Sequence, residues 1–177
     1  MKVLVTAFEP FNNLNNNYSI EVVNYLDGVT KVILDVVYDD CYKTLAKGYN
    51  LDEYDLLIAI GEARMRDKLT LELNAKNISS CSLKDNSGVL KKDEAIIEGG
   101  MDLIETKVQI SKVKGLVQFS CDAGKFVCNN LYYHLLANYP HKSLFIHVPE
   151  CNNDIKEYQK HAKTITNIIE ELTKESI

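Results

Sequence analysis

Two cysteines, Cys121 and Cys128, lie seven residues apart in the stretch SCDAGKFVCNN, and a cysteine thiolate is a strong nucleophile toward an acyl carbon. A helix predicted to begin near Lys125 places Cys128 in its first turn, where free N–H groups and the helix dipole would lower the pKa of the thiol. Gly124 allows a tight turn just before this helix. Cys121 ends the preceding strand without a helix dipole behind it, so we expect it to be inert. The sequence also fits a buried core cysteine at position 128.

A thiol nucleophile needs a base, and His147 is the best candidate among the four histidines. It ends the apolar run LFIHV, so its imidazole lies at the carboxyl end of a predicted buried strand and must find a polar partner there. A structural core histidine fits the same position. His134, His141 and His161 fall on a helix, in a loop and on an amphipathic helix, and we expect them at the surface or rim.

A third group should orient the histidine, and Glu72 is the candidate. It lies on the polar face of the alternating segment LTLELNAKN, where a charged side chain is expected in any half-exposed strand. Position alone therefore does not single Glu72 out.

Buried strands alternate with helices along the chain, which predicts one α/β layered domain over residues 1–177 with a largely parallel sheet. Ser19 is a candidate N-cap for the first helix. The predicted strands cover residues 2–8, 32–38, 54–60, 69–77, 115–120 and 142–148. The predicted helices cover residues 19–26, 39–49, 101–110, 125–139 and 154–174, with a polar loop at 78–98.

The composition is that of an ordinary globular domain, with 177 residues, 46% hydrophobic and 25% charged. A net charge of −5 does not favour binding to nucleic acid or to an anionic membrane. No apolar run approaches the ~20 residues of a membrane span, and MKVLVTAF predicts a buried strand, not a signal peptide. Five cysteines, an odd number, favour reduced thiols in the cytoplasm. The chain lacks metal-ligand spacings and a Gly-rich phosphate loop, so we expect no metal and no cofactor.

Four stretches together resemble one family, the pyroglutamyl-peptidase I or pyrrolidone-carboxylate peptidases. SCDAGKFVCNN matches the family pattern Ser-x-x-Ala-Gly-x-Phe-x-Cys-Asn, which puts the nucleophile on Cys128. FIHVP matches the histidine segment and puts the base on His147. GEARMRDKLTLELNAKN matches the Gly-x-Ala-x-x-Arg segment that ends Glu-x-x-Ala-x-Asn, and makes Glu72 the third catalytic residue. TAFEPF matches the opening Gly-Phe-Glu/Asp-Pro-Phe.

The resemblance implies an α/β/α sandwich with a mostly parallel, mixed, twisted sheet. It implies a cytoplasmic cysteine peptidase that removes an N-terminal pyroglutamyl residue from small peptides through a thiol-acyl intermediate. Family members often self-associate, which leaves a homo-oligomer open for this chain. Substrate contacts are implied for Phe8, Phe11, Asn17, Glu62 and Arg66, the two phenylalanines as the aromatics on either side of the lactam ring.

The chain departs from the family pattern around the expected substrate. Where the family has paired glycines, Pro, Gln, Gly-Gly and Arg, this chain has Asn12-Asn13, Tyr18, Glu62, Arg64-Met65 and Ser82. These changes keep two other functions open. One is a related cysteine amidohydrolase with a different small acyl group, and the other is a non-catalytic binding protein on the same fold.

Overall fold

A six-stranded sheet forms the centre of the protein in the computed structural model, which describes residues 1–174. Its strand order is β2 (Thr30–Leu34), β1 (Val3–Phe8), β3 (Leu56–Glu62), β8 (Ser143–Val148), β4 (Thr70–Glu72) and β7 (Gln118–Ser120). The first four strands run parallel, whereas β4 pairs with β8 antiparallel and with β7 parallel. A separate pair joins β5 (Asn74–Lys76) to β6 (Leu103–Glu105).

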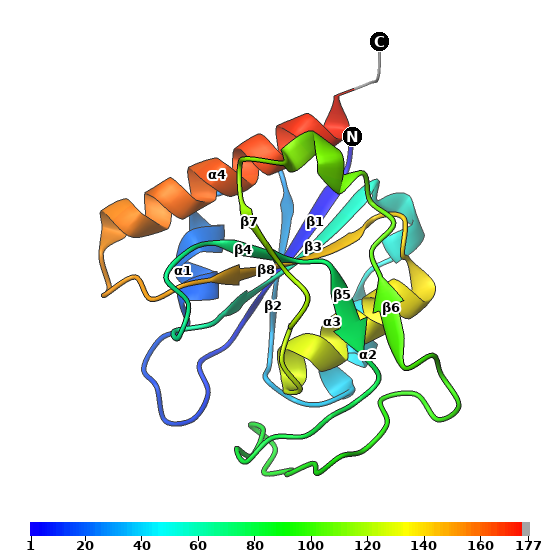
Figure 1. The fold of residues 1–177 in the computed structure, drawn as a ribbon. Helices are drawn as coiled ribbons and strands as arrows, with labels where there is room; N and C mark the ends of the chain where they lie inside the picture. The colour runs from blue at the N-terminus through cyan, green and yellow to red at the C-terminus, as the bar shows by residue number, and fades with distance from the viewer. Residues whose placement is uncertain (175–177) are drawn as a thin grey trace.

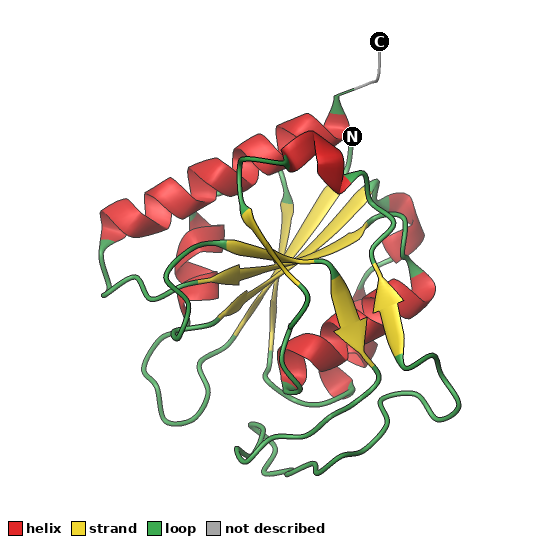
Figure 2. Cartoon of the chain, in the orientation of Figure 1, coloured by secondary structure: helices red, strands yellow, loops and turns green. Residues whose placement is uncertain are grey.

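Helices cover both faces of this sheet (Figure 1; Figure 2). The helices α1 (Tyr18–Asn24) and α4 (Ile155–Thr173) pack on one face, and α2 (Asp40–Gly48) and α3 (Val127–Asn138) pack on the other. Two short 3₁₀ turns lie at Leu51–Glu53 and Ile110–Val113. The predicted α/β/α sandwich with a mostly parallel, mixed sheet is therefore confirmed.

Two apolar layers result because the side chains of each buried strand alternate between the faces. In β1, Val3 and Val5 face α1 and α4, while Leu4 and Phe8 face α2 and α3. No helix in the described part of the chain has both the length and the apolarity that crossing a bilayer requires.

The carboxyl ends of the parallel strands meet at one edge of the sheet, where parallel α/β proteins place their ligands. The loops that follow β1 and β8 leave the sheet at this edge, and the long segment 77–102 runs below it (Figure 1). The candidate site is built at this edge.

Several predicted elements differ in the structure. The helix predicted at 101–110 is wrong, because 103–105 is the strand β6, whose alternating burial places Ile104 inward against Ala75 of β5. The first helix is capped by Asn17 and not by Ser19, since the Asn17 side chain accepts the N–H of Ser19. The strand predicted at 32–38 ends at Leu34.

The alternating segment 69–77 is not one half-exposed strand. It breaks at Leu73 into β4 and β5, because the Leu73 N–H donates to Ser120 O and its carbonyl accepts from Thr106 N–H, each outside this segment. Glu72 was expected on an exposed polar face, but its side chain is fully buried.

Candidate active site

Cys128 is the second residue of α3, at the helix end that points toward the sheet edge. The N-cap residue, Phe126, offers no side-chain hydrogen bond to the helix. The first N–H groups of a helix have no partner within the helix, so an uncapped N-terminus leaves them available to an anion. The helix start thus combines a thiol with free backbone donors.

Two asparagines directly behind the cysteine fix this helix in place. Asn129 accepts the N–H of Lys76 at 3.0 Å and donates to the carbonyls of Lys76 and Ile78 at 2.9 and 3.0 Å. Asn130 accepts the N–H of Asp39 at 2.9 Å and donates to its carboxylate at 2.9 Å. Both asparagines are fully buried, and the sequence reading gave them no role. The feature of the sequence that points to this role is the pair of amide side chains among the apolar residues that this helix buries.

Gly61 leaves room for the sulfur of Cys128. A Cβ atom at position 61 would lie 2.7 Å from Cys128 Sγ and 2.9 Å from Phe145 Cζ. Gly61 pairs in register with His147 across β3 and β8. The thiol therefore lies against the carboxyl ends of the two central strands.

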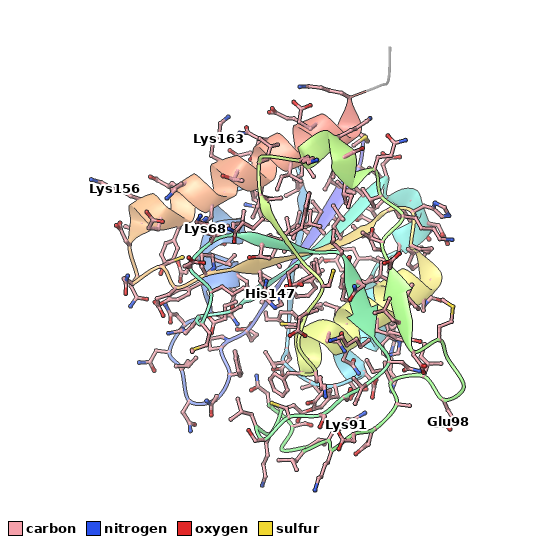
Figure 3. The ribbon with its side chains drawn as sticks, in the orientation of Figure 1. Lys68, Lys91, Glu98, His147, Lys156 and Lys163 are labelled. Carbon is pink, nitrogen blue, oxygen red and sulfur yellow. The ribbon has the colours of Figure 1, made fainter. Side chains whose placement is uncertain are left out.

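His147 and Glu72 are diagonal neighbours on one face of the sheet. Thr70 pairs with His147 and Glu72 pairs with Phe145, which brings the imidazole next to the carboxylate. Nδ1 of His147 lies 2.7 Å from Oε1 of Glu72. His147 is 5% exposed and Glu72 is 0% exposed, so water does not screen this contact. Figure 3 shows His147 near the middle of the molecule.

Arg66 also binds the Glu72 carboxylate. Its Nη2 lies 2.7 Å from Oε1 of Glu72, and the same nitrogen donates to Asp122 O at 2.7 Å and to Ser120 Oγ at 3.3 Å. Burial would raise the pKa of Glu72, but His147, Ser120 and Arg66 together outweigh it, so the pKa lies below its usual value. Glu72 is thus held ionised, as an orienting carboxylate must be.

The thiol of Cys128 differs from the sequence-based expectation. Burial, followed by the nearby carboxylates of Glu62 and Glu72, raises its pKa to about 12, whereas the helix N-terminus alone predicted a lowered value. Among the described residues, no hydrogen bond joins its sulfur to His147. The resting thiol is therefore neutral.

Cys128 and His147 line one small cavity of about 140 Å³. Phe8, Phe11 and Phe126 form its aromatic wall, and the rings of Phe11 and Phe126 lie 5.7 Å apart. The remaining lining residues are Val36, Glu62, Ala123 and Val127. A cavity of this size and apolar lining suits a small acyl group.

Two residues with expected substrate contacts lie outside this lining. Asn17 is buried, and its amide caps α1 and donates to Glu9 O at 3.2 Å. Arg66 contacts Glu72 and the 120–122 segment, as described above. The structure therefore places Phe8, Phe11 and Glu62 on the cavity wall and places Asn17 and Arg66 behind it.

A larger cavity of about 540 Å³ lies between α4 and the β4–β7 side of the sheet. It contains His161, which is 7% exposed and not at the surface as expected, and it contains no cysteine. The side chain of His134 is only 15% exposed, and its Nε2 lies 3.1 Å from Oδ1 of Asp39. His141 is exposed, as predicted. Of these two cavities, the smaller one is lined by both Cys128 and His147, and the larger one by neither. Residues 1–174 hold no cluster of three or more side chains suited to a metal ion.

Comparison with known proteins gives one family. The model of the pyroglutamyl peptidase family matches residues 1–173. A pyrrolidone-carboxylate peptidase of Thermosipho melanesiensis is 33% identical over 175 residues, covering 89% of this chain and 87% of that protein. One of Brachyspira hyodysenteriae is 32% identical over 173 residues, covering 88% and 86%. A mutant pyrrolidone carboxyl peptidase of solved structure, from the hyperthermophile Pyrococcus furiosus, is 28% identical in sequence. Its structure matches with a TM-score of 0.85 over 97% of this chain and 98% of that one.

Proposed function

The chain belongs to the pyroglutamyl peptidase family, and from this premise we propose that Cys128, His147 and Glu72 carry out its reaction. The chain is a cysteine exopeptidase that removes an N-terminal pyroglutamyl residue from peptides. The observation that supports the three residues most directly is the buried contact between Glu72 Oε1 and His147 Nδ1, beside a cavity that also holds the Cys128 thiol.

The geometry gives each residue a separate task. An ionised Glu72 can only accept a hydrogen bond, so it accepts the Nδ1–H of His147 and leaves Nε2 as the basic nitrogen. Nε2 takes the proton of Cys128 as Sγ forms a bond to the pyroglutamyl carbonyl carbon. The carbonyl electron pair moves onto oxygen, where the free N–H groups at the start of α3 stabilise the charge.

The intermediate then collapses and the peptide departs. His147 gives its proton to the leaving nitrogen as the C–N bond breaks, which leaves a thioester on Cys128. Water attacks this thioester, His147 takes a proton from the water, and the C–S bond breaks. The proton returns to the sulfur, so the resting thiol is restored.

The wall of the cavity selects the acyl group. Phe8, Phe11 and Phe126 offer aromatic faces to a flat lactam ring. Glu62 lies on the same wall, where it faces the ring. Arg66 acts on the reaction through Glu72, and Asn17 through the start of α1. We also propose a cytoplasmic location, since all five cysteines of the chain are unpaired.

The decisive experiment measures release of a fluorophore from a pyroglutamyl-coumarin amide under reducing conditions. We expect the wild type and Cys121→Ser to be active, because Cys121 is exposed and outside the cavity. We expect Cys128→Ser to lose activity by at least about 10³-fold. Equal loss in both variants, or activity in Cys128→Ser, would refute the assignment of the nucleophile.

The prolyl-coumarin amide is the matched substrate control, because proline lacks the lactam carbonyl but keeps the ring. A site built to hydrogen-bond the lactam rejects such an analogue strongly. Equal cleavage of the two amides would favour a cysteine amidohydrolase with a different acyl specificity. Absence of any hydrolysis by the wild type would favour the binding protein.

A further inference from the structure

The acyl cavity contains a carboxylate that no catalytic step uses. Glu62 ends β3, its side chain is 3% exposed, and it lines the cavity together with Cys128 and His147. The reaction builds negative charge on the Cys128 sulfur and then on the carbonyl oxygen. A second negative charge in the same buried space opposes both steps.

Arg64 neutralises this carboxylate through two contacts. Its Nε donates to Oε1 of Glu62 at 3.1 Å, and its Nη2 donates to Oε2 at 3.3 Å. The backbone N–H of Tyr18 donates to Oε2 at 2.9 Å. A guanidinium that engages both oxygens is the strongest pairing available to a carboxylate.

Arg64 is itself fixed in position. Its guanidinium carbon lies 4.3 Å from the centre of the Tyr18 ring, and its Nη2 donates to Oδ1 of Asn16 at 3.2 Å. The Tyr18 hydroxyl donates to Glu150, which joins the cluster to the loop after β8. The Arg64 side chain is 29% exposed, so solvent screens the pair only in part.

We propose that Arg64 is a positioning residue that balances the Glu62 charge, so that Cys128 can become anionic during attack. The proposal rests on the proposed role of Cys128 as the nucleophile. In this proposal Arg64 balances the charge of Glu62 and does not contact the substrate. Other ionisable groups around the pair are Tyr18, Tyr158, Glu150 and the thiol of Cys151 beside Arg64, and His147 and Glu72 beside Cys128.

Tyr18, Glu62 and Arg64 form one contact cluster. In this cavity a carboxylate without a partner would oppose the build-up of negative charge on Cys128. A carboxylate that is paired with an arginine, which a tyrosine ring holds in place, does not.

The test is the rate at which iodoacetamide alkylates Cys128 in the full-length protein at pH 9. The protein is digested after the reaction, and mass spectrometry of the peptides measures the labelling of each cysteine. The reagent is uncharged and needs no substrate, so the readout is independent of pyroglutamyl specificity. Labelling of the exposed Cys121 in the same sample serves as an internal standard. The variants are Arg64→Met, Glu62→Gln and the double variant.

We expect Arg64→Met to slow alkylation of Cys128 about tenfold, the change in thiolate fraction that one pKa unit produces. The double variant should recover at least the wild-type rate, because it removes the unbalanced charge. Lys163→Met is the matched control, since it removes one positive charge from the exposed side of α4 (Figure 3) and should leave the rate unchanged.

Three results would overturn the proposal. An unchanged or faster rate in Arg64→Met would show that the arginine only covers the cavity. Equal slowing in Arg64→Met and in the double variant would show a structural role, which loss of the Glu62 charge cannot rescue. Equal slowing in Lys163→Met would show an effect of net charge alone. Loss of pyroglutamyl hydrolysis with a preserved alkylation pattern would count against the proposed function and not against this pairing.

Discussion

Gly61 leaves the space that the sulfur of Cys128 occupies, although it carries no reactive atom. A methyl group at this position would lie 2.7 Å from Sγ and 2.9 Å from the Phe145 ring, closer than such atoms approach one another. Phe145 is a fully buried residue of β8, so the thiol must move instead. The glycine is therefore part of the geometry of the proposed nucleophile.

Gly61→Ala should lower kcat/KM for the pyroglutamyl amide by about 100-fold, because displacement of a reacting atom by about 1 Å has an effect of this size. Steady-state kinetics measure the loss. Gly48→Ala is the matched control, since a Cβ at position 48 meets nothing within 4 Å. Full activity in Gly61→Ala would show that the thiol has more freedom than the structure implies.

In the proposed mechanism Glu72 orients the imidazole, and both His147 and Arg66 contact one oxygen of its carboxylate. Glu72→Gln keeps the size of the side chain but removes the charge and allows the wrong histidine tautomer. We expect kcat to fall by roughly 10⁴-fold with a smaller change in KM, as for another orienting carboxylate. Glu157→Gln, on α4 beside the larger cavity, should retain activity. A Glu72→Gln variant of normal kcat would remove Glu72 from the mechanism.

At the scale of elements, Asp39, which directly precedes α2, connects α3 with the segment 77–102. Its carboxylate accepts from Asn130, from Lys91 at 2.8 Å and from His134 at 3.1 Å. The hydrogen bond with His134, followed by the opposing effect of burial and then by Lys91 and Asn130, leaves the pKa of Asp39 well below its usual value. Asp39 thereby couples the start of α2 to the helix that carries the nucleophile.

Asp39→Asn should reduce the free energy of unfolding at pH 7 by about 2 kcal/mol. The backbone φ of 58° at this position is one that asparagine tolerates, so the loss reports the charge. The carboxyl of Asp39 has a lower pKa in the folded protein than its ordinary value of 3.8, so its ionised form stabilises the fold at pH values above 3.8. This contribution is lost as the pH falls below 3.8 toward the pKa of the folded protein. The difference between wild type and Asp39→Asn should therefore be constant above about pH 5 and narrow in acid.

Urea unfolding at several pH values measures this difference. Asp40→Asn is the neighbouring control, because Asp40 is 67% exposed and its pair with Lys43 adds little stability. A difference that grows on acidification would contradict the sign of the effect.

Most of the strands and helices that carry the site were predictable, because buried apolar runs mark β1, β3 and β8 clearly. The segment 101–110 was not, since Leu103, Ile104 and Glu105 form a short strand only by pairing with β5. Burial of Glu72 was equally hidden. Alternation alone cannot show that both faces of β4 are covered, and the pairing with β8 that brings His147 to Glu72 is long-range.

At the scale of the whole molecule, the site draws on nearly the entire chain. Phe8 and Phe11 come from its beginning, Cys128 from α3 and His147 from β8. The motif types were readable in the sequence, but the raised pKa of Cys128 was not. The pKa of Cys128 is raised first by burial and then by Glu62 and Glu72, which lie 66 and 56 positions before the cysteine.

The position of β8 has a consequence for the newly made chain. This strand is synthesised last among the strands, yet it lies between β3 and β4 in the centre of the sheet. A nascent chain that ends before Ser143 cannot join the two halves of the sheet, and it lacks the histidine as well. Closure of such non-local pairings is slow and comes late. We therefore expect the nascent chain to have no peptidase activity until β8 has left the ribosome.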